Sequence, residues 1–501
     1  MSKILLIICL LLFSWCIVTT GYNVLVVFPF PLRSLNIAGE GVVRNLLKAG
    51  HKVTYASSFP VLSDFNTENF THISVDSTRK VFENNPLLNM SFMMEHTMPE
   101  TDIWIVQHLA IEAALSAFHT EDFQRLLNDT SIQFDAIISS FVETELYSGL
   151  SAVYNCPMIW AYSLGAHSVI SKLVDQPVNP GYSADYTTGN SLPFTFQERV
   201  YQLWFQVRWF FYKLFYTQPR EKTIYEQFFV NDHHASGEAP AVPLSFKFLG
   251  GYHIEDPPKP LPKNLQTILD NAKDGAIYFS MGSTWKSKDF PKQVKEELLK
   301  MFGELKQTVI WKYEEDLPDT PANVHIVNWA PQQSILAHPN VRLLIYQGGH
   351  ASSIEALHFA VPQIGVPVYY DQNVNIKNAI RRGTALSAKL DVNLANSLRS
   401  LIREILTNNS YTERVKELSW IYHHRPQKPG VELVHWVEHV IKSRGARHLR
   451  SPALSLSFYQ RAFLDLASLI LVVLIALVII VKRCLTMFRN SHTKHRSKKM
   501  N

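Results

Sequence analysis

The segment from Trp329 to Gln372 constrains the fold more than any other part of this 501-residue chain. Within it, the apolar run Val341–Gln347 ends at Gly348-Gly349, and a second apolar run, QIGVPVYY, follows. Glycine lets backbone N–H groups approach a ligand closely, and a helix that opens just after it adds a positive dipole end. The segment therefore predicts an α/β architecture with a phosphate site where a strand meets a helix.

The same segment carries the side chains that a nucleotide-sugar site needs. Trp329 offers a flat face on which a base can stack, Gln332 offers an amide to a nucleoside, and Glu355 can accept hydrogen bonds from ribose hydroxyls. Further polar groups stand in the first turn of the expected helix and after the second apolar run: Ser352, Ser353, Asp371 and Gln372. The combination is far more specific than a strand–glycine–helix unit alone.

These residues resemble the signature of the UDP-glycosyltransferases, WxPQ…HPxxxxF…HGG…S..EA…VP…P…DQxxN. The chain departs from it at the histidine before the glycines, which is Gln347 here, and insect-type members of the family often carry glutamine at that place. The positions that match the signature are Trp329, Pro331, Gln332, His338, Pro339, Gly348, Gly349, Ser352, Glu355, Ala356, Pro362, Pro367, Asp371, Gln372 and Asn375. The resemblance extends from FPFP near residue 28 to the basic tail.

The resemblance implies two doubly wound, Rossmann-like domains that face a cleft, which is the glycosyltransferase-B type of α/β fold. It also implies inverting transfer of a sugar from a UDP donor to a small lipophilic acceptor, without a metal or a further cofactor. Positions that match the family's donor contacts are Ser283, Trp329, Gln332, Gln347, Gly349, Ser352, Glu355, Asp371 and Gln372. By this resemblance, Ser283, Gln347, Gly349 and Ser352 would face phosphate, and Asp371 and Gln372 the sugar. His338 is interpreted as a structural residue.

The pattern of apolar runs agrees with an α/β fold. Strands at Asn23–Phe28 and Lys52–Ala56 enclose a helix expected from about Ala38 to Ala49 and closed by Gly50, which makes a βαβ unit. Other expected strands are Phe134–Ser139, Met158–Tyr162, Gly275–Ser280, Thr308–Lys312, Val324–Val327, Val341–Ile345 and Gln363–Val366. Two series of alternating strands and helices, separated by a proline-rich linker, predict two doubly wound domains.

We expect six regions along the chain. The body comprises an acceptor-binding domain at 21–249, a linker at 250–264, and a UDP-sugar-binding domain with a return segment at 265–460. A signal peptide at 1–20 precedes it, and a transmembrane helix at 461–482 and a basic tail at 483–501 follow. The signal peptide is predicted from one lysine, a short apolar core and small residues. The membrane span is predicted because Ala462–Val481 supplies roughly the 20 apolar residues that a bilayer core requires.

The distribution of basic residues predicts how the chain is oriented in the membrane. Seven of them follow the apolar run without any acidic residue, so the net charge of +5 says little about the body and indicates no nucleic-acid partner. A cytosolic tail and a lumenal body make a single-pass type I protein, and Lys498 and Lys499 match an endoplasmic reticulum retrieval signal. Only Cys156 remains in the lumenal part, so no disulfide is expected within it. Glycosylation sequons stand at Asn69, Asn89, Asn128 and Asn408.

This chain lacks a basic residue at the position where the family carries its catalytic base. The family places a histidine in the loop after the first strand, where this chain has Leu35, and an acid after the FDxxx strand, a position that falls near Ser140. His51 cannot replace it, because it precedes the next strand at the wrong end of the unit. Three readings stay open: acceptors that need no base, such as amines or acidic phenols; another base, such as Glu143, Glu145 or water; or a non-catalytic relative that binds a UDP-sugar or a lipophile, or pairs with active homologues.

Several properties stay open at this level. Insect-type relatives suggest glucose over glucuronic acid, and an aromatic-lined cleft suits ecdysteroids, plant phenolics or xenobiotics in a detoxification role. Homo- or hetero-oligomers are both compatible with the sequence. The aromatic stretch between Leu192 and Phe229 could rest on the lumenal leaflet, line the acceptor cleft or pack on its own domain. A dinucleotide oxidoreductase is disfavoured, because no G-x-G-x-x-G follows the first strand, and no spacing of metal ligands is present.

Overall fold

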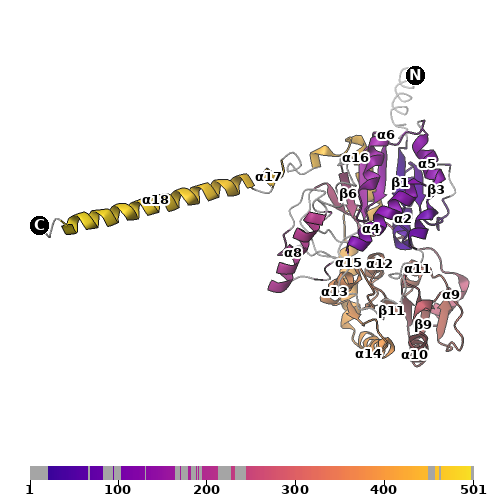
Figure 1. The fold of residues 1–501 in the computed structure, drawn as a ribbon. Coiled ribbons are helices and arrows are strands. Elements are labelled where there is room, and N and C mark those ends of the chain that lie inside the picture. Colours follow the sequence, from indigo (N-terminus) through magenta and orange to yellow (C-terminus); the bar gives the residue numbers. More distant parts are fainter. Residues whose placement is uncertain are drawn as a thin grey trace, which may run out of the picture. The chain divides into compact units, whose positions relative to one another are not determined.

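The chain forms two compact units, a body that ends at Leu449 and a C-terminal unit that begins at Arg450. The computed structural model describes residues 21–65, 68–82, 94, 103–129, 131–163, 170, 179–181, 188, 190, 194–212, 227–231, 244–449, 457–461 and 464–497. The predicted signal peptide, Asn89, and Lys498 and Lys499 lie outside the described residues. Within the body, two parallel sheets make an amino-terminal and a carboxyl-terminal lobe (Figure 1).

The amino-terminal lobe is built on a sheet in which every described pairing is parallel. Its strand order is β3 (Phe70–Ser74), β2 (Lys52–Ser57), β1 (Asn23–Phe28), β4 (Ala136–Ser140), β5 (Met158–Tyr162), β6 (Gln227–Asn231) and β7 (Phe246–Phe248). Its helices are α2 (Arg33–Lys48), α4 (Ile103–Phe118), α5 (Glu121–Asn128), α6 (Gly149–Tyr154) and α8 (Phe196–Tyr212). The central strands are buried on both faces, as continuous apolar runs require in a parallel sheet.

The helix after β1 begins earlier than the sequence predicts. Helix α2 starts at Arg33, directly after Leu32 in an extended conformation, so Leu35 lies in its first turn and not in a loop. The expected start was about Ala38, so Gly39 and Gly41 lie inside the helix in both cases, at positions where β-carbons would collide with Tyr55 and the backbone of His253. The helix ends as expected, since Gly50 has a φ of +85° and its N–H donates to the carbonyl of Leu47.

The carboxyl-terminal lobe repeats this architecture. Its parallel strand order is β10 (Val324–Val327), β9 (Thr308–Lys312), β8 (Ala276–Ser280), β11 (Val341–Tyr346), β12 (Gln363–Gly365) and β13 (Ala385–Ser387). Its helices are α9 (Lys263–Asp270), α10 (Lys292–Gly303), α11 (Gln332–Leu336), α12 (His350–His358), α13 (Gln372–Arg381), α14 (Leu394–Thr407) and α15 (Ser410–His423). The doubly wound fold predicted for both halves is confirmed.

The last helix of the body returns to the amino-terminal lobe. Helix α16 (Pro429–Lys442) buries Leu433, Val437 and Val440 in the same core cluster as β1, β2 and α2. Tyr422, on the preceding helix, donates a hydrogen bond of 3.1 Å to the carbonyl of Gly250 in the connection between the lobes. The chain therefore ties its two lobes together twice, through the connection and through this return segment (Figure 1).

The C-terminal unit contains helices α17 (Phe458–Arg461) and α18 (Leu464–Ser497). Within α18, the segment Leu464–Met487 has a mean hydropathy of 3.2 over its most apolar window and no buried residue there. By length and composition, this segment could cross a membrane. Among the described residues, both cysteines, Cys156 in the body and Cys484 on α18, are free thiols.

The core of the carboxyl-terminal lobe should be sensitive to loss of Trp311. This indole is fully buried on β9 and packs at ring-centroid distances of 5.3 Å from Phe279 and 5.6 Å from Phe302. We predict that Trp311→Ala lowers the free energy of unfolding by about 3–5 kcal/mol, because the cavity cannot fully collapse. Thermal unfolding of the detergent-solubilised chain, monitored by near-UV circular dichroism, measures this.

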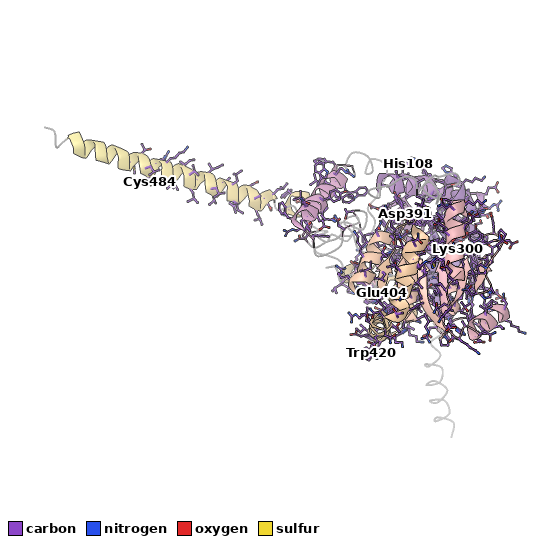
Figure 2. All side chains as sticks on the ribbon, turned by 90° about the horizontal axis from the view of Figure 1, so that it is seen from below. His108, Lys300, Asp391, Glu404, Trp420 and Cys484 are labelled. Carbon is purple, nitrogen blue, oxygen red and sulfur yellow. The ribbon has the colours of Figure 1, made fainter. Side chains whose placement is uncertain are left out.

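The matched control is Trp420→Ala. Trp420 is 64 % exposed on α15 and projects from the surface of the body (Figure 2). Its removal should change stability by less than about 0.5 kcal/mol. Equal destabilisation by the two variants would contradict the placement of Trp311 in the core.

Candidate functional site

The candidate site lies where the strand order of each sheet reverses. In the carboxyl-terminal sheet, the chain leaves β8 toward β9 on one side and leaves the adjacent β11 toward β12 on the other. In the amino-terminal sheet, β1 and β4 diverge in the same way. Connections that diverge beyond the carboxyl ends of parallel strands leave a crevice in which ligands bind. A cavity of about 430 Å³ is lined by residues that follow all four strands.

The structure brings all the predicted donor residues to this one cavity. Its lining includes Ser283, Trp329, Gln332, Gln347, Gly349, Ser352, Glu355, Asp371 and Gln372. They reach it from four connections, which follow β8, β10, β11 and β12. His338 does not line the cavity: its Nε2 lies 3.0 Å from Asp270 Oδ1 and its Nδ1 accepts a hydrogen bond from the N–H of Asn340, which fits the structural role expected for it.

Glu355 is the centre of a buried hydrogen-bond network. Gln332 Nε2 donates to Glu355 Oε2 at 2.5 Å, and Gln333 Nε2 donates to Glu355 Oε1 at 2.9 Å. His253, from the connection between the lobes, places Nε2 3.4 Å from the same Oε1. Gln332 Nε2 also donates to Ser352 Oγ at 2.9 Å. A carboxylate has about four acceptor positions, so these contacts hold Glu355 in place and leave capacity for a ligand hydroxyl.

The Gly-Gly turn leads directly into α12. Gly348 has a φ of +94°, and a β-carbon there would meet Ile376 at 2.8 Å and the carbonyl of Gln372 at 3.0 Å, so only glycine fits. Gly349 is the N-cap of α12, whose first residues line the cavity. The first N–H groups of a helix have no partner within the helix and carry its positive dipole end. This end of α12 is suited to an anion.

Gln347 reaches the turn after β8. A β-carbon on Gly282 would lie 2.4 Å from Gln347 Nε2, and Gly282 has a φ of +85°. Gln347 Oε1 is buried and has no hydrogen-bond partner within the described part of the chain. An amide that is packed this closely and only partly satisfied is placed to bond a ligand in the cavity, but it adds no charge.

A buried cationic side chain beside this turn is Lys312, which the sequence analysis did not select. Lys312 is the last residue of β9, is buried, and lines the cavity. Its Nζ donates to the carbonyl of Gly282 at 2.9 Å and to Glu314 Oε1 at 2.5 Å. These contacts hold the ammonium beside the Gly282-Ser283 turn. The sequence signal for it is a lysine as the last residue of an apolar strand in the carboxyl-terminal lobe.

Asp371 and Gln372 form one end of the carboxyl-terminal wall of the cavity. This wall carries the predicted donor residues and is called the donor wall below. Asn375 Nδ2 donates to Asp371 Oδ2 at 2.6 Å, yet burial dominates and raises the pKa of Asp371 to about 6. Gln372 Oε1 accepts hydrogen bonds from the N–H groups of Val368 at 2.8 Å and Tyr369 at 3.1 Å. The amide oxygen is thus used to shape the loop, and the amide NH₂ is the group that can serve a ligand.

The opposite wall of the cavity is mostly apolar and comes from the amino-terminal lobe. Leu35 lines it from the first turn of α2, together with Phe30, Leu32, Leu62, Phe82, Val106, Leu109, Phe141 and Val142. Ser140 is buried at the end of β4 and is not part of the lining. His51 is held at the other end of β2 by Glu438, at 3.3 Å, and also lies outside the lining. Leu35, expected at the family's base position, has no proton acceptor, and the hydroxyl of Ser140, expected near the position of the acidic partner, is a poor one.

Glu143 is the carboxylate of this wall that faces the other lobe. It is buried, lines the cavity and has a φ of +50°, a strained conformation for a residue with a side chain. Tyr370, whose φ is +66°, donates its hydroxyl to Glu143 Oε1 at 3.4 Å across the cleft. Glu40 also lines this wall, but three donors on Asn36, Leu62 and Ser63 fix its carboxylate. Glu145 does not line the cavity.

Two further contacts join the lobes at the rim of the cavity. Arg44 Nη2 lies 3.2 Å from Glu255 Oε1, which connects α2 to the segment between the lobes. The guanidinium of Arg33 lies 5.8 Å from the ring centroid of Trp329 and 4.6 Å from that of Phe59. Trp329 remains 51 % exposed, so a flat ligand can still stack on it. Within the described residues, no group of three or more His, Cys, Asp or Glu side chains could hold a metal ion.

Comparisons with known proteins agree with this geometry. The family model described as UDP-glucoronosyl and UDP-glucosyl transferase matches residues 23–499. UDP-glucosyltransferase 2 of Dactylopius coccus is 29 % identical over 98 % of both chains, and UDP-glucuronosyltransferase 2A3 of Cavia porcellus is 27 % identical over 90 % of both. Among solved structures, the spinosyn rhamnosyltransferase SpnG has a TM-score of 0.55 at 15 % identity, covering 84 % of this chain and all of its own, and so shares the fold. The chain belongs to the UDP-glycosyltransferase family and is a glycosyltransferase.

Proposed function

We propose that this enzyme transfers glucose from UDP-glucose to small lipophilic acceptors that are amines or acidic phenols, with Glu143 as the proton acceptor. The observation that carries the proposal is the division of one cavity into two walls. One wall gathers the donor residues around the start of α12, and the other is apolar except for a few polar groups that include Glu143. Glucose is chosen because the relative named a glucosyltransferase matches 98 % of the chain.

The donor would lie along the carboxyl-terminal wall. Uracil would stack on Trp329 beside Gln332, and the ribose hydroxyls would donate to Glu355, whose neighbours hold its carboxylate in place. The sugar hydroxyls would bond Asp371 and the amide NH₂ of Gln372. Because Gln332, Glu355 and Gln372 are held by hydrogen bonds within the protein, and Asp371 by Asn375, little conformational entropy of these side chains is lost when the donor binds.

The leaving diphosphate needs positive potential. The N–H groups at the start of α12, the hydroxyls of Ser283 and Ser352, and the amide of Gln347 would bond its oxygens, and the ammonium of Lys312, partly balanced by Glu314, would add positive potential that Gln347 lacks. We therefore propose transfer without a metal ion, as the family resemblance implies. Activity that survives excess EDTA would support this, and activity restored only by added Mg²⁺ would oppose it.

The acceptor step follows from the residues near Leu35. The acceptor nitrogen or oxygen attacks the anomeric carbon, the bond from that carbon to the diphosphate oxygen breaks, and the acceptor proton passes to Glu143. A carboxylate is a weaker base than an imidazole, so a substrate with its own lone pair or an acidic proton suits it better than an aliphatic alcohol. Tyr370 donates to Glu143 and keeps it turned toward the second lobe.

The donor wall gives a prediction for pH. Because the pKa of Asp371 lies at about 6, the side chain is mostly neutral at pH 5 and mostly charged at pH 7. Sugar hydroxyls bond a carboxylate more strongly than a neutral carboxyl group. We predict that the KM for UDP-glucose, which has no group titrating in this range, falls by about tenfold as the pH rises from 5 to 7. Initial rates at saturating acceptor measure it.

Asp371→Asn is the matched control for that experiment. The variant should bind UDP-glucose weakly at every pH, and its KM should lose the step near pH 6. A step that persists in Asp371→Asn would assign the titration to another group and remove Asp371 from the sugar contacts.

The absence of a base at position 35 predicts which acceptors the enzyme turns over fastest. The Leu35→His/Ser140→Asp variant restores both family positions and should raise turnover of an aliphatic alcohol by about 10²-fold or more, with a much smaller effect on an aniline. Glu143→Gln in the unmodified chain should lower aniline and phenol turnover by roughly 10²-fold. Product formation from UDP-glucose in membranes, quantified by mass spectrometry, measures both.

Glu145→Gln is the control, because Glu145 is buried close by but does not line the cavity. Fast alcohol turnover by the unmodified chain, unchanged in the double variant, would refute the assignment of Leu35. Wild-type-like turnover in Glu143→Gln would remove Glu143 as the base. Tight UDP binding without turnover of any acceptor would instead favour a non-catalytic UDP-sugar or lipophile binder.

We also propose a lumenal body anchored in the endoplasmic reticulum membrane by α18. The basic residues that follow the apolar segment of α18, with no acidic residue among them, support this topology. Three of the four sequon asparagines, Asn69, Asn128 and Asn408, are described and exposed, so they are accessible to glycosylation in the lumen.

This topology gives a direct test. Endoglycosidase H should increase the electrophoretic mobility of the full chain expressed in insect cells, and Asn69→Gln, Asn128→Gln and Asn408→Gln should each reduce that change where the site is used. Surface exposure is the physical reason, since the transferase must reach an asparagine on the folded or folding body. A chain that endoglycosidase H does not affect, with its tail protected from protease in sealed microsomes, would indicate the opposite topology.

A further inference from the structure

Helix α8 carries an exposed apolar face that the cavity and the core do not use. Seven large apolar side chains on it are 38–72 % exposed: Phe196, Val200, Leu203, Trp204, Val207, Phe210 and Phe211. None of the residues of α8 lines the cavity. Figure 1 shows α8 at the periphery of the body. A soluble surface seldom exposes apolar side chains in such a contiguous group without a binding role.

The face is a regular stripe. At about 100° per residue, the seven side chains fall within an arc of about 120° on the helix. The opposite side of α8 is anchored to the body, because Gln202, Phe205 and Trp209 are almost fully buried there. Gln202 Nε2 donates to Thr188 Oγ1 at 2.7 Å. The helix is therefore held by one apolar side while it presents a second apolar side outward.

Two arginines border the stripe. By the same helical geometry, Arg199 lies next to one edge of the arc and Arg208 next to the other. Both are exposed, and the Arg199 guanidinium lies 5.9 Å from the ring centroid of Phe196. The acidic residue of α8, Glu198, lies off the stripe at the first turn, where it accepts a hydrogen bond from the N–H of Thr195 at 2.7 Å. The exposed face is thus apolar at its centre and cationic at both sides.

We propose that the exposed face of α8 lies in the headgroup and upper acyl region of the leaflet that faces the body. Aliphatic side chains suit the acyl boundary, aromatic rings suit the headgroup level, and arginines can reach lipid phosphates while their stems stay with the apolar stripe. The chain also carries its own candidate span, Leu464–Met487, which would keep the body near a bilayer. This inference does not depend on the proposed acceptor or base.

The charge pattern favours a lipid surface over a second copy of the chain. Two copies that met through this stripe would face each other's arginines, and no acidic residue of the stripe would pair with them. A lipid surface instead offers phosphate groups at the depth where the two guanidinium groups lie.

The test uses the full chain in nanodiscs that hold one copy each. Single cysteines replace Leu203 or Val207 in the stripe, or Trp420 on α15 as the control, in a background in which the native cysteines are replaced by alanine. Each is labelled with a nitroxide and studied by power saturation with lipid-soluble oxygen and a water-soluble nickel chelate. Trp420 is a suitable control because it is exposed on the body surface (Figure 2).

The proposal predicts that oxygen relaxes the labels at 203 and 207 at least threefold more effectively, relative to the nickel chelate, than it relaxes the label at 420. Arg199→Gln/Arg208→Gln should reduce this ratio, and phosphatidylserine in place of a fifth of the phosphatidylcholine should increase it in the parent chain but not in that variant.

Labels at 203 and 207 with the accessibility of the label at 420 would overturn the proposal. Spin–spin broadening at 203 that appears only in discs holding two copies, together with nickel accessibility in single-copy discs, would assign the face to self-association and also overturn it. UDP binding by each labelled chain verifies folding.

Discussion

The buried carboxylate of Glu355 is the interaction on which the arrangement of the cleft depends. A charged group that is only 5 % exposed is costly unless donors surround it. Its partners come from two segments that are distant in sequence: Gln332 and Gln333 at the start of α11, and His253 in the connection between the lobes. Gln332 Nε2 also donates to Ser352 Oγ, so the hydrogen bonds around this carboxylate extend to the first turn of α12. The donor wall is organised before any ligand arrives.

Much of the fold could be predicted from the sequence, because parallel strands buried on both faces appear as continuous apolar runs. The bounds expected for β1, β5, β9 and β10 agree with the structure. The predicted start of α2, about Ala38, was wrong by several residues, and Gly39 and Gly41 lie inside the helix. Their role is contact: each glycine leaves room for a neighbour, Tyr55 in one case and His253 in the other. Such contacts join residues far apart in the sequence, and no local pattern reveals them.

The candidate site, like the fold, could be predicted from the sequence only in part. A motif with a fixed spacing predicted the donor residues, and the sheet topology brings them to one cavity because the carboxyl ends of β8 and β11 are neighbours. Lys312 and Tyr370 were not foreseen. Lys312 matters through its contact with the carbonyl of Gly282, and Tyr370 through a hydrogen bond that crosses to the other lobe. The first contact needs β8 and β9 to be paired within one lobe, and the second needs both lobes in place.

The substitutions at the catalytic positions are best understood together. By the family resemblance, Leu35 stands where a base is expected and Ser140 stands at or near the position of its acidic partner, and Leu35 extends the apolar wall of the cavity. The donor wall, in contrast, keeps its groups and their supporting hydrogen bonds. A protein that only bound lipophilic molecules would not need a phosphate cradle with two glycines, Gly282 and Gly348, in the left-handed region. This contrast supports altered acceptor chemistry in preference to a loss of function.

Binding of a uracil-linked diphosphate by the carboxyl-terminal wall of the cavity underlies the proposed donor, chemistry and acceptor preference. Isothermal titration calorimetry of the full chain in nanodiscs with UDP tests this claim. The account predicts one site per chain, with binding weakened by at least about tenfold in Glu355→Ala and in Trp329→Ala, which correspond to losses of about 1.4 kcal/mol or more. Folded protein that gives no heat of association with UDP at any temperature, or that binds UDP equally well in both variants, would contradict it.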